Sequence, residues 1–176
     1  MAYDVEEAKK LVVEAGKKLL ETGLIARTWG NVSARISDTQ FVITPSGRAY
    51  DTLTPEEVVV VNIDDCSHEG DIKPSSEKGI HADAYKHHPL VNFVIHTHQK
   101  AATIVSITGM EIRNVYNEFK PVLGDYVPVA DYAMSTTNPL RKNVEKCIRH
   151  AKISMAVLLV MVILLGWGAK VTPTGF

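Results

Sequence analysis

The chain has 176 residues, of which 45% are hydrophobic and 22% are charged. This length and composition suffice for one domain with a sizeable hydrophobic core, and they exclude a disordered or fibrous chain. The formal net charge is -1, with 19 basic residues scattered among 20 acidic ones, which argues against nucleic acid as the main partner.

The cysteines and the apolar segments indicate where in the cell the protein resides. Cys66 and Cys147 stand far apart and fit no metal or disulfide framework, which is typical of a reducing compartment, so we expect a cytoplasmic protein. Residues 1–20 have the pattern of a charged amphipathic helix rather than of a secretion signal. The apolar run 155–165 is shorter than the roughly 20 residues that span a bilayer. We therefore expect a buried strand there and no membrane partner.

The first half of the chain predicts a helix, a hairpin and a further strand. Asp4 can cap the first helix, and Gly23 closes it. Residues 31–36 and 40–44 are predicted to form the two arms of a hairpin, because turn residues separate them. A capped helical turn over 54–57 precedes a predicted strand over 58–63.

The second half continues the mixture of helices and strands. Residues 75–88 have helical spacing, and Pro89 ends that helix. Residues 91–98 alternate and branch like a strand that enters the core. Further helices are predicted over 100–108 and 138–152, with a late strand over 155–165. No repeat or flexible linker interrupts the chain, so we expect one layered α/β or α+β domain over 1–176.

A His-x-His pair is the sharpest local signal for chemistry. His96 and His98 stand at the end of a predicted strand. Because side chains alternate across a strand, both imidazoles are expected on one side, where they can share a metal ion. Such a pair also occurs among solvated or core histidines, so the pair alone does not establish a metal site.

Three further segments can contribute to a site. Ser75, Ser76 and Glu77 stand at a predicted helix start, where the amides and the helix dipole favour an anion such as phosphate. Glu77 can complete a metal site or take a proton from a metal-bound substrate. The turns 29–33 and 44–47 contain glycine and can approach a phosphate closely. A capped helix and two ordinary turns explain the same residues equally well.

In their order along the chain, these motifs resemble the class II aldolase/adducin family. The resemblance rests on Gly30-Asn31-Val32-Ser33, Thr44-Pro45-Ser46-Gly47, Pro74-Ser75-Ser76-Glu77, His81 and His96-Thr97-His98. It covers most of residues 1–160 with approximately the family's spacing. It implies a three-layer α/β/α fold with a central, largely antiparallel sheet, and a homo-oligomer, commonly a tetramer with active sites at subunit interfaces.

The resemblance also implies roles for individual residues. Glu77, His96 and His98 would bind one Zn²⁺ per subunit, and Glu77 would act as the base as well. The substrate phosphate would lie among Gly30, Asn31, Ser46, Gly47, Ser75 and Ser76. Zinc would then stabilise the enediolate left when a ketose phosphate is cleaved to dihydroxyacetone phosphate and an aldehyde. Tyr116 lies near the family's proton-donating tyrosine, although Asn117 competes for the aligned position.

Other functions within the family stay open. Pentulose-phosphate 4-epimerases resemble this sequence too, but they carry Asp where this chain has Glu77, which favours an aldolase. A methylthioribulose-phosphate dehydratase and a non-catalytic, adducin-like binding protein are the alternatives.

The sequence departs from the family pattern from about residue 161. The family's third zinc histidine follows an apolar strand like Ala156 to Val160, but Met161-Val162 stands there in this chain. We also expect the family's later helices to be missing after Phe176. One reading-frame shift accounts for both, because His-Gly codons read one base later can encode Met-Val. The departure predicts weak metal binding and little aldolase activity.

Overall fold

The computed structural model describes residues 3–150 of the chain. They divide into two compact units, one ending at Thr97 and the other beginning at His98, and each is described by itself. The predicted strand over 155–165 and the departure at Met161 lie outside the described residues. The expectation of one domain over 1–176 therefore stays a prediction.

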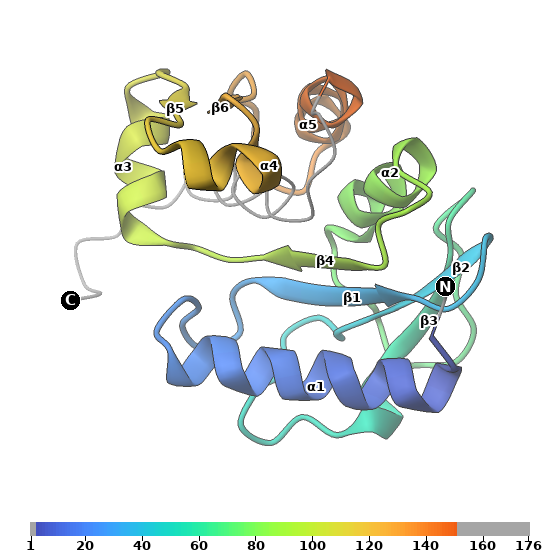
Figure 1. Ribbon diagram of the computed structural model, residues 1–176. Helices are drawn as coiled ribbons and strands as arrows, with labels where there is room; N and C mark the ends of the chain where they lie inside the picture. Colours follow the sequence, from blue (N-terminus) through green and yellow to red (C-terminus); the bar gives the residue numbers. More distant parts are fainter. Residues whose placement is uncertain (1–2, 151–176) are drawn as a thin grey trace. The chain divides into compact units, whose positions relative to one another are not determined.

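A four-stranded antiparallel sheet forms the centre of the first unit, in the order β3-β2-β1-β4 (Figure 1). Its strands are β1 (Asn31–Arg35), β2 (Gln40–Ile43), β3 (Val59–Asn62) and β4 (Phe93–His96). The predicted hairpin is confirmed, since Ser33 of β1 pairs with Ile43 of β2. The short helix η1 (Pro55–Glu57) precedes β3, as its Thr54 cap and Pro55 predict.

Helix α1 (Val5–Glu21) covers one face of this sheet (Figure 1). It begins at its predicted cap, where the Asp4 carboxylate accepts a hydrogen bond from the Glu6 backbone N–H at 3.0 Å. Its apolar side packs on Val32 and Ala34, which alternate along β1 toward that face. The other core members include Ala8, Val12, Val13, Leu19, Ile25, Val42, Tyr50, Leu53 and Val58.

Helix α2 (Lys78–His87) covers the opposite face (Figure 1). Tyr85 of this helix packs against Phe41 of β2, with the ring centroids 5.1 Å apart. The guanidinium of Arg35 lies 4.7 Å from the centre of the same tyrosine ring and donates to the Tyr85 carbonyl at 2.6 Å. Helices on both faces of an antiparallel sheet confirm the predicted three-layer α/β/α fold.

Two of the differences between predicted and observed element boundaries affect the site. Helix α2 begins at Lys78 rather than at Ser75, because the chain up to Ser75 is paired with the Thr44–Pro45 segment: Pro74 bridges Pro45, and the Ser75 N–H donates to the Thr44 carbonyl at 3.1 Å. Strand β4 ends at His96 rather than at His98. Its partner β1 begins opposite His96, at Asn31. The residue before Asn31 is Gly30, which belongs to a turn, so the ladder between β1 and β4 ends at this pair.

Within the described part of the chain, the second unit contains three α-helices, one 3-10 helix and a short two-stranded sheet. The elements are α3 (Lys100–Ile107), β5 (Ile112–Arg113), η2 (Asn117–Phe119), α4 (Lys120–Leu123), β6 (Tyr126–Val127) and α5 (Asn138–His150). The predicted helices near 100 and 138 are thus confirmed. None of the helices within residues 3–150 is long and apolar enough to cross a membrane. Cys66 and Cys147 are both free thiols.

Candidate metal and phosphate site

Two neighbouring strand ends provide the base of the site in the first unit. Asn31 begins β1 and His96 ends β4, and the two residues are paired across the sheet. Both are buried, with exposed fractions of 5% and 1%. Gly30 makes the turn before Asn31, with φ of 82°. A Cβ atom at Gly30 would lie 2.6 Å from the His96 carbonyl oxygen, so the turn requires glycine for space as well as for conformation.

Glu77 reaches this pair from the turn that precedes α2. Its Oε2 atom lies 2.7 Å from His96 Nδ1 and 2.9 Å from Asn31 Nδ2. Burial by itself raises the pKa of Glu77, but the adjacent His96 and the hydrogen bonds from His96 and Asn31 outweigh it and hold the pKa at about 2. Glu77 is therefore a buried carboxylate at neutral pH.

The carboxylate determines which ring nitrogen of His96 can bind a metal. Glu77 Oε2 only accepts hydrogen bonds, so the 2.7 Å contact requires a proton on His96 Nδ1. When the imidazole is neutral, the lone pair then lies on Nε2. A carboxylate beside an imidazole held in this tautomer is a common arrangement around protein-bound zinc, and the donor chemistry fits a divalent metal.

The loops predicted to bind phosphate lie together at this end of the sheet. Pro45 and Pro74 form an isolated β-bridge, and the Ser46 N–H donates to the Lys73 carbonyl at 2.9 Å. The Thr44 hydroxyl accepts from the Val32 N–H at 3.2 Å. These bonds join the turns that contain Asn31, Ser46 and Ser75, three segments far apart in the sequence.

The residues of these loops differ in their access to solvent. Ser46, Gly47 and Ser76 are exposed, whereas Ser75 is buried and its hydroxyl accepts from the Glu77 N–H at 3.3 Å. The serine pair does not stand inside a helix start as predicted, because α2 begins after it. Phosphate binding here would use loop amides and hydroxyls rather than the first turn of α2.

Two predicted site residues belong to the second unit. His98 is its first residue, and Tyr116 precedes η2 with an exposed fraction of 61%. Because β4 ends at His96, the strand alternation that predicted two parallel imidazoles does not extend to His98. No group of three or more His, Cys, Asp or Glu side chains within residues 3–150 is arranged to hold a metal ion. The three-ligand set Glu77, His96 and His98 thus stays a prediction.

A set of buried polar side chains extends the site inward. Ser33, His81 and Tyr85 are all at most 1% exposed. Sequence reasoning placed Ser33 and His81 among the family motifs without a role and did not single out Tyr85. Spacing was the available signal: Asn31 and Ser33 share one face of a strand, and His81 and Tyr85 share one face of a helix.

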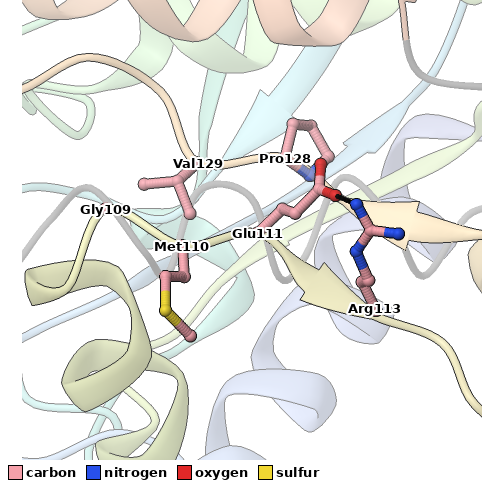
Figure 2. A pocket seen from close by; sticks show the side chains of 6 residues that line it. All are labelled: Gly109, Met110, Glu111, Arg113, Pro128 and Val129. Carbon is pink, nitrogen blue, oxygen red and sulfur yellow. Dashed lines mark ion pairs between the residues drawn. The ribbon is translucent and has the colours of Figure 1, made fainter.

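A separate surface hollow of about 760 Å³ lies within the second unit, and Figure 2 shows the side chains that line it. The lining residues are Gly109, Met110, Glu111, Arg113, Pro128 and Val129. Glu111 and Arg113 form an ion pair of 2.9 Å there. None of the predicted site residues lines this hollow.

Comparison with known proteins adds a family and a set of similar structures. The family model for the class II aldolase and adducin N-terminal domain matches residues 10–172. A solved structure of an L-fuculose 1-phosphate aldolase is 28% identical, with a TM-score of 0.76, over 85% of this chain and 70% of that one. The L-fuculose-1-phosphate aldolase of Thermus thermophilus is 27% identical, with a TM-score of 0.67, over 83% of this chain and 73% of that one.

A third structure supports the fold alone. YgbL of Klebsiella pneumoniae, described as a putative aldolase/epimerase/decarboxylase, is 23% identical with a TM-score of 0.77. The match covers 85% of this chain and 73% of that protein.

Proposed function

Because this chain belongs to the class II aldolase and adducin family, we propose that it is a metal-dependent lyase acting on a ketose phosphate such as L-fuculose 1-phosphate. The products would be dihydroxyacetone phosphate and an aldehyde. Members of this family bind sugar phosphates and typically a divalent metal. The observation that carries the proposal is the buried contact between Glu77 and His96, beside loops able to bind phosphate.

Glu77, His96 and His98 are the proposed metal ligands. One carboxylate and two imidazoles form a ligand set that suits Zn²⁺ and leaves a position for substrate. When bound, Zn²⁺ supplies positive charge that stabilises an enediolate. The proton on Nδ1 leaves Nε2 of His96 to bind the ion, and Glu77 has to leave Nδ1 to bind the same ion, because Nδ1 and Nε2 point to opposite sides of the ring.

Glu77 is also the proposed base. It takes the proton of the substrate hydroxyl next to the bond that breaks; the O–H electrons form the aldehyde carbonyl, and the C–C electrons pass into the enediolate. Its pKa of about 2 keeps the carboxylate ionised at neutral pH, so that it has a lone pair to accept this proton. Tyr116 is the proposed donor of the proton that the enediolate carbon receives.

The substrate phosphate would bind the loops beside the carboxylate. Ser46, Gly47, Ser75 and Ser76 offer hydroxyl and amide donors, and Gly30 with Asn31 completes the proposed set. The bonds between the Thr44 and Lys73 segments support this proposal, because they hold donors from two distant loops at one end of the sheet.

Assembly and location complete the proposal. A homo-oligomer, a tetramer in many relatives, fits the family resemblance, and a cytoplasmic location fits the two free cysteines. Sedimentation of the purified chain would test the first, and fractionation of cells the second.

The decisive experiment titrates the metal-free full chain with Co²⁺ and assays cleavage of L-fuculose 1-phosphate. Because Met161 stands where the family has a histidine, we expect weak binding that strengthens in Met161→His. His96→Gln should abolish the cobalt absorption, whereas His68→Gln, in the loop after β3, should leave it unchanged. Absence of any saturable cobalt signal from both the parent chain and Met161→His would overturn the metal site. Metal binding without ketose-phosphate cleavage in either chain would overturn the aldolase assignment.

A further inference from the structure

A line of buried hydrogen bonds leads from Glu77 into the space between β1 and α2. Beyond Asn31 it passes through His81 and Ser33 to Tyr85. The helix provides His81 and Tyr85 at positions i and i+4, and the strand provides Asn31 and Ser33 at i and i+2. The two spacings bring the four side chains into register on facing surfaces.

The direction of each bond follows from the ionised carboxylate at its end. Asn31 must turn its NH₂ group toward Glu77, because the flipped amide would set its oxygen against a carboxylate oxygen at 2.9 Å. The amide oxygen therefore faces His81 Nε2, so that Nε2 carries a proton. Asn31 Nδ2 also lies 3.3 Å from His96 Nδ1, since both groups donate to the same oxygen of Glu77.

The remaining bonds then have a single consistent arrangement. A neutral imidazole has one N–H, so His81 Nδ1 accepts the hydroxyl proton of Ser33 at 2.6 Å. Burial, with a further contribution from nearby His96, lowers the pKa of His81 to about 3 and keeps the ring neutral. The Ser33 oxygen in turn accepts from the Tyr85 hydroxyl at 2.8 Å. Every donor in the line points toward Glu77.

We propose that His81 is a positioning residue: held in one tautomer by Ser33 and Tyr85, it fixes the Asn31 amide that orients the Glu77 carboxylate. This inference depends on one part of the proposed function, namely that Glu77 is the metal ligand and base. The line is not a proton relay, because the Asn31 amide cannot readily take up and pass on a proton. Its effect is to hold the carboxylate in place, as outer hydrogen bonds do around metal ligands.

The scaffold explains why this arrangement holds its orientation. Arg35 fixes Tyr85 by its bond to the backbone carbonyl and by its position over the ring. Polar groups buried this deeply are stable only when they are hydrogen-bonded, so removing one link leaves its neighbours unsatisfied. An apolar residue at position 81 would leave the Ser33 hydroxyl and the Asn31 amide oxygen without this partner, and Asn31 would no longer be held in one orientation.

The first test reads the tautomer of His81 in the metal-free full chain. Long-range ¹H–¹⁵N spectra of the imidazoles should show a proton on Nε2 and a bare Nδ1, and Ser33→Ala should shift the Nδ1 signal. A proton on Nδ1, or an Nδ1 signal unaffected by Ser33→Ala, would overturn the proposal. Because no metal or substrate is present, this result does not depend on the proposed activity.

The second test compares cobalt affinity in His81→Leu and His81→Gln, in a Met161→His background if the parent chain binds too weakly. Loss of an outer hydrogen bond typically weakens metal binding about 10–100-fold. We expect a loss of at least about tenfold for leucine and substantial recovery for glutamine, whose amide can still donate to Asn31. Equal affinities for folded His81→Leu and the parent would overturn the positioning role. If neither background binds cobalt, the proposed metal site fails, and the tautomer measurement still decides the inference.

Discussion

The Nδ1 atom of His96 lies 2.7 Å from Oε2 of Glu77, and the two side chains are only 1% and 11% exposed. The contact joins the end of a central strand to the turn before a helix, and Asn31 secures it from the neighbouring strand. A carboxylate so placed can hold a histidine tautomer, bind a metal or accept a proton. Most of the predictions below concern this group and the turns that position it.

Removal of the Glu77 charge should weaken metal binding while leaving the fold intact. We expect Glu77→Gln to lower Co²⁺ affinity by about 100-fold, because a neutral amide is a poor ligand and a weaker acceptor for the His96 Nδ1–H than a carboxylate. Cobalt titration monitored by visible absorption measures the effect. Glu69→Gln, on the exposed loop after β3, serves as the control. Equal affinities for Glu77→Gln and the parent would contradict this role for Glu77.

The free energy of unfolding should decrease as the pH falls below about 6.5. The folded chain keeps His81 neutral down to a pKa of about 3, whereas the unfolded chain takes up a proton near 6.5, so this stability is present above 6.5 and lost on acidification. Glu77 acts in the same direction between 4.5 and about 2. Each group contributes a slope of at most about 1.4 kcal/mol per pH unit. Urea unfolding at pH values from about 7 to about 5 measures how much of this pH dependence comes from His81. His81→Leu should flatten this part of the profile, and an unchanged slope would refute the assignment.

Gly30→Ala should destabilise the chain more than Gly23→Ala. Both glycines have positive φ, 82° and 68°, so each substitution costs about 1–2 kcal/mol from the backbone conformation. At Gly30 the new Cβ atom also lies 2.6 Å from the His96 carbonyl oxygen, whereas at Gly23 nothing lies within 4 Å. We expect a further loss of about 1–3 kcal/mol at Gly30. Equal unfolding free energies of the two variants would argue against the close approach.

Gly16→Ala should destabilise α1 even though alanine is the better helix former. Alanine favours a helix over glycine by about 1 kcal/mol, but a Cβ atom at Gly16 overlaps the ring of Tyr50, with Cε1 at 2.7 Å. Overpacking of this kind costs about 1–3 kcal/mol, which is the larger effect. Thermal unfolding tests the sign. In a Tyr50→Ala background the same substitution should become stabilising, and a loss there would place the cause elsewhere.

Ser46→Ala and Ser76→Ala should weaken phosphate binding. Both residues are exposed in loops joined by the Pro45 and Pro74 bridge, so their loss leaves the fold unchanged. One lost hydrogen bond corresponds to about 0.5–1.5 kcal/mol, or roughly 2–10-fold in affinity. Titration with inorganic phosphate, followed by amide NMR shifts, measures this. Ser37→Ala, in the β1–β2 turn, is the control. An effect at Ser37 equal to that at Ser46 would remove the proposed site.

Local patterns in the sequence were sufficient for much of the fold. The Asp4 cap, the turn between β1 and β2 and the Thr54-Pro55 signal each act within a few residues, and the structure confirms all three. The ordered motifs also predicted the layered fold and the family. The pairing of Asn31 with His96 brings together two of the residues singled out in advance.

The sequence by itself determined the kinds of elements and the residue types available for chemistry. Tertiary structure alone decided where α2 begins and β4 ends, because Pro74 is paired with Pro45 just before the helix and β1 gives way to the turn at Gly30 opposite the end of β4. It also decided that His81 and Ser33 form one line with Glu77. The i, i+2 spacing along β1 and the i, i+4 spacing along α2 are local properties of the sequence. Which residues of the helix face which residues of the strand depends instead on how their side chains pack in the tertiary structure.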